Sequence, residues 1–263
     1  MRWFLTLIFC LLPFNVLADD AKPVDVAIVV SYDRSESIDQ GEAEAQIAGL
    51  IYTLRHKRFH TAVASGYFRR IALSAIAWSS FTKHELIMPW MQIGNADQAH
   101  MAALWLEKFR DRGEQIGHGS QTDVAWGIKL AAEQMHALPW WASKKVINMV
   151  GDGISNIGRI ASIARDETLA AGITINGLVM ARGHAVGIIK DFFRKQVIGG
   201  PSSFVQAAKP LSAYYRREVI GGPTSFLQLS RTNQDFAQAM LRKMTLEMVR
   251  LQGRIRRAKG GAG

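Results

Sequence analysis

Cysteine is almost absent from this chain of 263 residues, in which Cys10 is the one cysteine. It lies inside an apolar run from Trp3 to Leu17, so a chain cut after this run would contain no cysteine. Such a chain can form neither a disulfide nor a thiolate metal site. We therefore expect its stability to come from a packed core, for which this length suffices in one large α/β domain or two small ones.

Long apolar segments are also missing beyond the first residues, since no later run reaches the ~18 residues typical of a membrane span. The start of the chain has a basic residue, Arg2, then the apolar run, then small residues Val16 and Ala18 before Asp19. This layout predicts a secretory signal peptide at residues 1–18, with an uncleaved membrane anchor as the alternative. We expect an exported bacterial protein, periplasmic or secreted, with no transmembrane segment in the mature chain.

Acidic residues are scarcer than basic ones, 22 against 32, which gives a formal net charge of +10. The excess is strongest after residue 249, where five basic residues occur without an acid: Arg250, Arg254, Arg256, Arg257 and Lys259. We expect residues 252–263 to be a basic disordered tail that is either simply solvated or in contact with an anionic surface. Export argues against a specific nucleic-acid partner.

Apolar patterning predicts strands that alternate with helices. A continuous β-branched run indicates a buried strand at 26–30, further strands are expected at 71–78, 145–150 and 173–180, and 85–89 fits a short edge strand that Pro89 ends. Helical spacing marks residues 39–54, 97–109, 122–136, 160–171 and 233–251, the first with Asp39 and Glu42 as a capping box. The fold class is therefore α/β, a doubly wound, mostly parallel sheet with one antiparallel edge strand and helices on both faces, within one domain at 19–251.

An internal repeat departs from this alternation. The segment FFRKQVIGGPSSF at 192–204 returns 22 residues later as YYRREVIGGPTSF at 214–226. We interpret each copy as a helix end, a Gly-Gly-Pro turn and a short strand. The second copy, which is nearer the last helix, is the better candidate for a sheet strand, and the first is then an insertion outside the sheet. A doubled recognition surface is the functional alternative.

Oxygen-bearing side chains gather where the first predicted strand ends. Asp33, Ser35 and Ser37 alternate directly after it, so an extended loop could turn all three toward one point. Thr122 stands at the start of a predicted helix, and Asp152 directly follows the strand at 145–150. Sites in parallel sheets form at the carboxyl ends of strands, and hard divalent cations prefer oxygen ligands. The five residues are therefore candidate ligands of one metal ion.

This pattern resembles the metal-ion-dependent adhesion site of von Willebrand factor type A (vWA) domains, over roughly Val24 to Leu251. The chain is also similar to an uncharacterised group of secreted bacterial vWA proteins, as the segments AGITINGL at 171–178 and VIGGP at 219–223 indicate. The resemblance implies that Ser35, Ser37 and Thr122 bind the ion directly, while Asp33 and Asp152 act through water. The duplicated Gly-Gly-Pro segment departs from the usual domain.

The resemblance also implies a function. An ion held by neutral hydroxyls keeps much of its charge and seeks an anionic ligand, often an Asp or Glu carboxylate of a partner protein. We therefore expect a protein-binding module that uses Mg²⁺, or Mn²⁺ or Ca²⁺ in its place, and no enzyme activity. The alternatives are a hydrolase that uses a metal-activated water, with Glu36 as the nearby extra carboxylate, and a scaffold without a metal role.

Each candidate ligand also has a purely local interpretation. Ser37 could cap the first helix, Thr122 could cap the helix that follows it, and Asp152 could stabilise a Gly-Asp-Gly turn. Other motifs are weaker, because the chain contains no P-loop, no G-x-S-x-G elbow and no dinucleotide fingerprint after the first strand. His56 and His60 lie in a basic segment that we expect to be solvated rather than zinc-binding. The Trp140-Trp141 pair is either packed or, if exposed, part of a partner surface.

Overall fold

The structure is a computed structural model, and it describes residues 22–38, 40–111, 119–152, 154–180, 185–201, 203, 205–208 and 236–248. Six strands form one sheet in the order β3-β2-β1-β4-β5-β6. Their bounds are Val24–Asp33 (β1), Ile71–Ser80 (β2), Lys83–Ile93 (β3), Ala142–Gly151 (β4), Thr174–Met180 (β5) and Val205–Ala208 (β6). All neighbours pair in parallel except β2 and β3, which are antiparallel. The predicted sheet is confirmed, and β1 lies at its centre.

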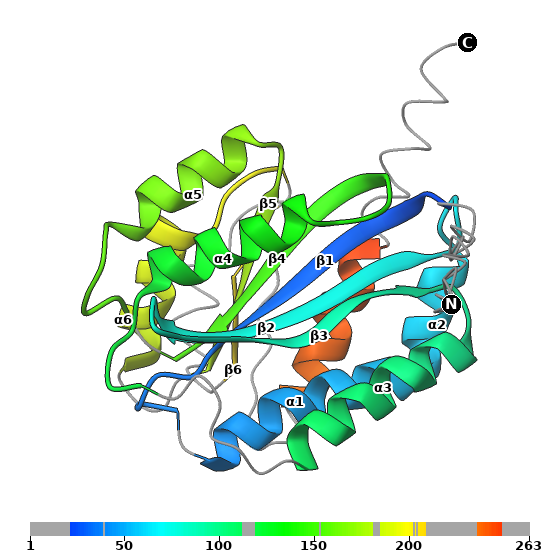
Figure 1. Cartoon of the computed structure of the whole chain (residues 1–263), viewed down its shortest axis with the longest axis horizontal. Coiled ribbons are helices and arrows are strands. Elements are labelled where there is room, and N and C mark those ends of the chain that lie inside the picture. The colour runs from blue at the N-terminus through cyan, green and yellow to red at the C-terminus, as the bar shows by residue number, and fades with distance from the viewer. Residues whose placement is uncertain are drawn as a thin grey trace, which may run out of the picture.

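Helices cover both faces of this sheet. Their bounds are Gln40–Arg55 (α1), Lys57–Ala64 (α2), Ala96–Asp111 (α3), Val124–His136 (α4), Ala161–Ala170 (α5) and Ala185–Phe192 (α6), with a π-helical turn at Phe193–Val197. Figure 1 shows α4 and α5 on one face and α1 with α3 on the other. Because alternate residues of β1 point to opposite faces, Val26 and Ile28 pack in one core, and Ala27 and Val29 pack in the other.

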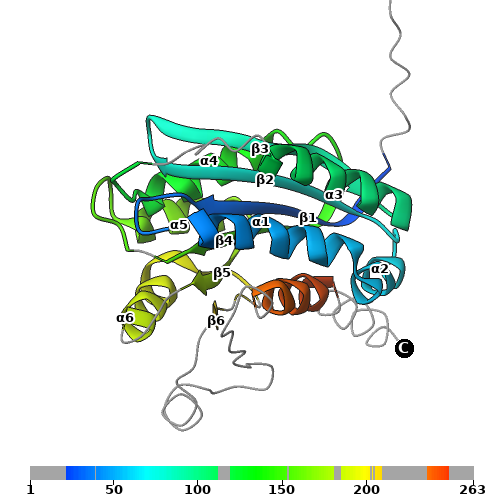
Figure 2. The ribbon, with the colours of Figure 1, turned by 90° about the horizontal axis from the view of Figure 1, so that it is seen from below.

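The last described helix, residues 236–248, fastens the C-terminal part to the sheet. It lies beside α1, since Gly49 leaves room for the ring of Phe236, and Figure 2 shows the two helices on the same side of the sheet. Glu247 is fully buried and accepts hydrogen bonds from Asn148 of β4 (3.2 Å) and Asn176 of β5 (2.8 Å). The ammonium of Lys243 lies 3.5 Å from the same carboxylate. This buried polar cluster fixes where the helix crosses the two strands.

The edge strand β3 differs from its prediction, because it continues through Pro89 to Ile93. Leu73 pairs with Met91 and Ala75 with Met88, so two residues of β3 face one of β2 at the proline. Such a bulge at a sheet edge needs no hydrogen bond from the proline nitrogen. Pro89 therefore bends the strand without ending it.

Helix α2 was not predicted. His56 is its N-cap, and its Nδ1 accepts a hydrogen bond from the backbone N–H of Arg58 at 3.1 Å. The ring of His60 bonds the carbonyl oxygen of Leu54 at 2.6 Å. Phe59 and Val63 are buried at helical spacing. The basic residues Arg55, Lys57 and Arg58 are exposed, as expected, whereas both histidines are half-buried and have structural contacts.

The first copy of the repeat is also placed differently from the expectation. It packs against the sheet: Gly199 forms an antiparallel bridge with Ile175 of β5, and the next described strand, β6, extends the sheet from Val205. Phe193 and Val197 are buried, and Gly200 has a φ of 92° that glycine adopts readily. The first copy therefore leads into the edge strand, and the second copy lies outside the described residues, as does Asp39 of the expected capping box.

Candidate functional site

The candidate site begins where β1 leaves the core. Asp33 is the last residue of this buried strand, and its Oδ1 accepts a hydrogen bond from the backbone N–H of Ser35 at 2.9 Å. This local contact turns the chain directly after the strand. The loop is then held by Gly119, which forms a parallel bridge with Ser35 and whose carbonyl accepts from the N–H of Glu36 at 3.0 Å.

Side-chain contacts join four of the five predicted residues. The hydroxyl oxygens of Ser35 and Ser37 lie 3.2 Å apart, and the hydroxyl of Ser37 donates to Oδ1 of Asp152 at 2.7 Å. With the bond between Asp33 and Ser35, these contacts form a continuous chain across the ends of β1 and β4. Ser37 therefore turns toward Asp152, and Asp152 contacts more than its own turn. Two carboxylates and two hydroxyls that are distant in sequence meet at the carboxyl edge of the sheet.

Thr122 is tied by backbone contacts to the loop that follows β4. Its N–H donates to Oδ1 of Asn156 at 2.8 Å, and its carbonyl accepts from the N–H of Asn156 at 3.0 Å. Asn156 lies in the loop that follows Asp152, so Thr122 is tied to the same loop. The N-cap of α4 is Asp123, whose side chain accepts from the N–H of Trp126 at 2.9 Å. Thr122 is thus buried one residue before the cap and does not itself cap the helix.

Sequence reasoning missed the residues that fasten this part of the site. Asn156 bonds both the backbone N–H and the backbone carbonyl of Thr122. Ser155 accepts a hydrogen bond from the N–H of Val124 at 3.1 Å. The Ser-Asn pair a few residues after a central strand was the available signal. Polar residues of this kind are common in loops, however, so the pair alone did not distinguish them.

A close approach between two strand ends keeps Asp33 and Asp152 near each other. A Cβ atom on Gly151 would lie 2.9 Å from the Cβ of Asp33, closer than real Cβ atoms come. Only glycine fits at this position without a shift of the backbone. The sequence Gly151-Asp152 therefore brings its carboxylate beside the end of β1.

Electrostatics at the site favour a positive charge. The pKa of the Asp33 carboxyl is raised from 3.8 to about 7, chiefly by burial and in smaller part by the nearby Asp152 carboxylate, against the opposing hydrogen bonds from Ser35 and the charge of Arg34. Burial also lowers the pKa of the Arg34 guanidinium. A buried carboxylate with another close by is stabilised in its ionised form by a cation.

The donor set fits a hard divalent cation. Six oxygens placed octahedrally about 2.1 Å from Mg²⁺ lie about 3.0 Å from their neighbours. The distance of 3.2 Å between the hydroxyl oxygens of Ser35 and Ser37 agrees with this spacing. No group of three or more His, Cys, Asp or Glu suited to a metal occurs among the described residues. A metal at this edge would therefore depend on the hydroxyl oxygens.

Solved structures with the same fold are vWA domains and related proteins. The vWF domain of the type V pili tip protein Mfa5 from Porphyromonas gingivalis has a TM-score of 0.54 at 10% identity, covering 87% of this chain and 96% of that one. Proximal thread matrix protein 1 from the mussel byssus, in a structure with a zinc-occupied metal-ion-dependent adhesion site, has a TM-score of 0.54 at 15% identity. That alignment covers 86% of this chain and 48% of the mussel chain, so the chain spans about half of that protein. At these identities the likeness shows the fold, which is that of a vWA domain.

A family model described as "Protein of unknown function (DUF1194)" matches residues 23–212 and 206–252. The two matched parts meet between the repeat copies, and each part contains one copy. A comparison with curated protein sequences found no match.

Proposed function

The chain belongs to the family described as "Protein of unknown function (DUF1194)" and has the vWA fold, and on this premise we propose that it is an exported, metal-dependent protein-binding module. The observation that carries the proposal is the chain of contacts from Asp33 through Ser35 and Ser37 to Asp152. In this proposal Ser35, Ser37 and Thr122 hold the ion, and Asp33 and Asp152 orient the water around it. The mussel protein, whose corresponding motif holds zinc, supports a divalent ion here.

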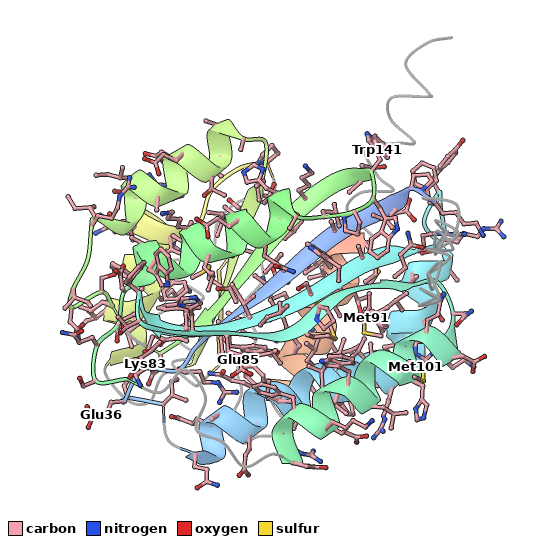
Figure 3. The ribbon with its side chains drawn as sticks, viewed as in Figure 1. Glu36, Lys83, Glu85, Met91, Met101 and Trp141 are labelled. Atoms are coloured by element: carbon pink, nitrogen blue, oxygen red, sulfur yellow. The ribbon has the colours of Figure 1, made fainter. Side chains whose placement is uncertain are left out.

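The chemistry of these residues favours binding over catalysis. A divalent ion held largely by neutral hydroxyls retains positive charge, which supports capture of an Asp or Glu carboxylate from a partner protein. Hydrolysis would also need a general base within reach of the reacting atoms. Glu36 is the extra carboxylate of the loop, but its side chain is exposed, and Figure 3 places it at the outer rim of this end. We therefore assign Glu36 no catalytic role.

Export is part of the same proposal. The apolar run at residues 3–17, with the basic residue before it and the small residues after it, supports a place outside the cytoplasm, in the periplasm or beyond. Among the described residues, no helix is both long and apolar enough to cross a membrane.

The test is a thermal unfolding series with and without Mg²⁺. A bound ion stabilises the folded state by mass action, by about 2.7 kcal/mol at a hundredfold excess over Kd. We expect Mg²⁺ to raise the Tm of the wild type, and Ser35→Ala or Asp152→Ala to abolish this rise while the protein remains folded in chelator. Glu36→Gln is the matched control within the same loop, and it should keep the full response.

Two outcomes would contradict the proposal. An unchanged Mg²⁺ response in both Ser35→Ala and Asp152→Ala would place the ion elsewhere. Turnover of ester, phosphoester or peptide substrates that requires Mg²⁺ and is abolished by Asp152→Ala would favour the hydrolase.

A pull-down from an envelope extract tests the partner directly. We expect the wild type to capture an envelope protein in Mg²⁺ and to release it in chelator, and we expect Asp152→Ala to capture none.

A further inference from the structure

An exposed cluster of aromatic rings lies at the end of the sheet opposite the candidate metal site. Tyr67 and Phe68 are in the turn between α2 and β2, and Trp141 immediately precedes β4. Tyr67 is 65% exposed and Trp141 62% exposed. Figure 3 shows Trp141 at one end of the molecule and Glu36 at the other. We call Tyr67, Phe68 and Trp141 the aromatic platform.

The platform is held in place and is not a set of loose side chains. The rings of Tyr67 and Phe68 meet edge to face with centroids 4.9 Å apart, and those of Phe68 and Trp141 are 5.9 Å apart. Both segments are tied to the start of β1: the N–H of Val24 donates to the carbonyl of Trp141 at 2.9 Å, and the N–H of Phe68 donates to Oδ1 of Asp25 at 3.1 Å. The fold therefore maintains an exposed apolar surface at a fixed place.

Basic residues predominate at this end of the sheet. Residues 22–24, 64–70, 94–97 and 137–145 lie here, and they contain one exposed acid, Asp97, against five basic residues: Lys22, Arg69, Arg70, Lys144 and Lys145. Lys22 and Arg69 are exposed. The carboxylate nearest in sequence, that of Asp25, is buried behind the turn. The outward surface is therefore both aromatic and positively charged.

The turn uses an arginine where the backbone favours glycine. Arg69 has a φ of 56°, and among the described residues it is the one residue other than glycine with a positive φ. Glycine adopts this conformation without the steric penalty that a Cβ atom brings. Local backbone geometry therefore does not explain an arginine here, where its exposed charge directly follows Phe68 of the platform.

We propose that the aromatic platform and its basic rim bind the surface of an anionic lipid bilayer. Tyrosine and tryptophan favour the boundary between headgroups and acyl chains, because each has an apolar ring and a polar atom. Arginine and lysine beside them are attracted by anionic headgroups. The lipid surface matches the patch in both charge and apolar character.

Vesicle flotation tests this proposal. The chain from Asp19 onward contains every described residue, and it would be floated with vesicles of phosphatidylcholine alone or mixed equally with phosphatidylglycerol. We expect the wild type to float with the mixed vesicles. Replacing Tyr67 and Trp141 together by alanine should lower the bound fraction about tenfold. Phe81→Ala is the matched control, because Phe81 is also 65% exposed but lies in the β2–β3 turn, at the metal-site end.

The variant Arg69→Gly separates binding from folding. Glycine suits the turn, so Tm should stay the same or rise, while the loss of one charge should weaken binding to the mixed vesicles about fivefold. Wild-type protein that fails to float would overturn the proposal. So would a Tyr67 and Trp141 double variant that floats like the wild type, because binding would then come from another surface such as the basic tail. If the protein binds neither kind of vesicle but captures another protein through the platform, the partner is a protein, and the lipid assignment is contradicted.

Discussion

Asp33 connects the burial of the central strand to the chemistry of the candidate site. Its position at the end of β1 follows from the apolar run before it, and the spacing to Ser35 and Ser37 is a sequence property. Together with Thr122 and Asp152, which stand at the ends of other predicted elements, five candidate ligands could be chosen from the sequence. Side-chain contacts in the structure join four of them: Asp33, Ser35, Ser37 and Asp152. Asn156 and Gly119 could not be chosen from the sequence, because their roles depend on backbone groups of loops that meet only in the folded chain.

Protonation of Asp33 should make stability depend on pH when no metal is bound. Its pKa rises from 3.8 to about 7 on folding, so the folded state holds a proton that the unfolded state releases. Stability is then fully present below the lower pKa and is lost as pH rises toward 7, by up to a few kcal/mol. In chelator, we expect Tm to fall between about pH 4 and about pH 7, and Asp33→Asn to remove this slope.

A metal should reverse this dependence, since the ion needs the ionised carboxylate and replaces the proton. The gain in Tm from Mg²⁺ should therefore grow as pH rises through about 7. A gain that is equal at pH values below and above this pKa would contradict the assigned role of Asp33.

Most secondary-structure elements could be predicted wherever burial in the core determines the pattern of apolar residues along the segment. β1, β2, β4 and β5 are runs of apolar residues, and such runs have few alternatives to a buried parallel strand. α2 was missed because it is short and begins at a histidine, which is not among the usual caps. The continuation of β3 past Pro89 depends on a bulge, and only the pairing with β2 reveals it.

The contact between the helix at 236–248 and the sheet offers a test of a buried ion pair. Glu247→Ala leaves the ammonium of Lys243 buried without its carboxylate and removes the partner of Asn148 and Asn176. We expect a loss of about 3–5 kcal/mol in the free energy of unfolding, measured with denaturant. Replacing Lys243 by Met and Glu247 by Leu together should cost less than Glu247→Ala, because both buried charges are removed together while the amides of Asn148 and Asn176 still lose their acceptor.

The repeat allows a deletion that tests whether its copies are interchangeable. Removing residues 192–213 joins Asp191 to the second copy, whose Val219, Gly221 and Gly222 match the docked Val197, Gly199 and Gly200. We expect the shortened chain to fold with a loss of about 1–3 kcal/mol, since Tyr215 would bury its hydroxyl where Phe193 packs. Failure of this chain to unfold cooperatively would show that the copies are not equivalent.

At the scale of the whole molecule, the two proposed binding surfaces lie at opposite ends of one sheet. Changes separated by more than about 10 Å and without shared partners usually act additively. We therefore expect Asp152→Ala to float with anionic vesicles like the wild type, and Arg69→Gly to keep the full Mg²⁺ response in thermal unfolding. Loss of vesicle binding in Asp152→Ala, or loss of the Mg²⁺ response in Arg69→Gly, would mean that the two ends are coupled through the sheet.

One strand spans the two ends. The N–H of Val24 donates to the carbonyl of Trp141, and Asp33 stands at the site, so the ten residues of β1 cover about 30 Å from first to last. β1 is paired along its length on both sides, with β2 and with β4. A tensile force applied between the two ends would act along this strand and shear both ladders at once instead of opening them one bond at a time. The topology thus provides mechanical resistance along the axis that would join a tethered surface to a captured partner.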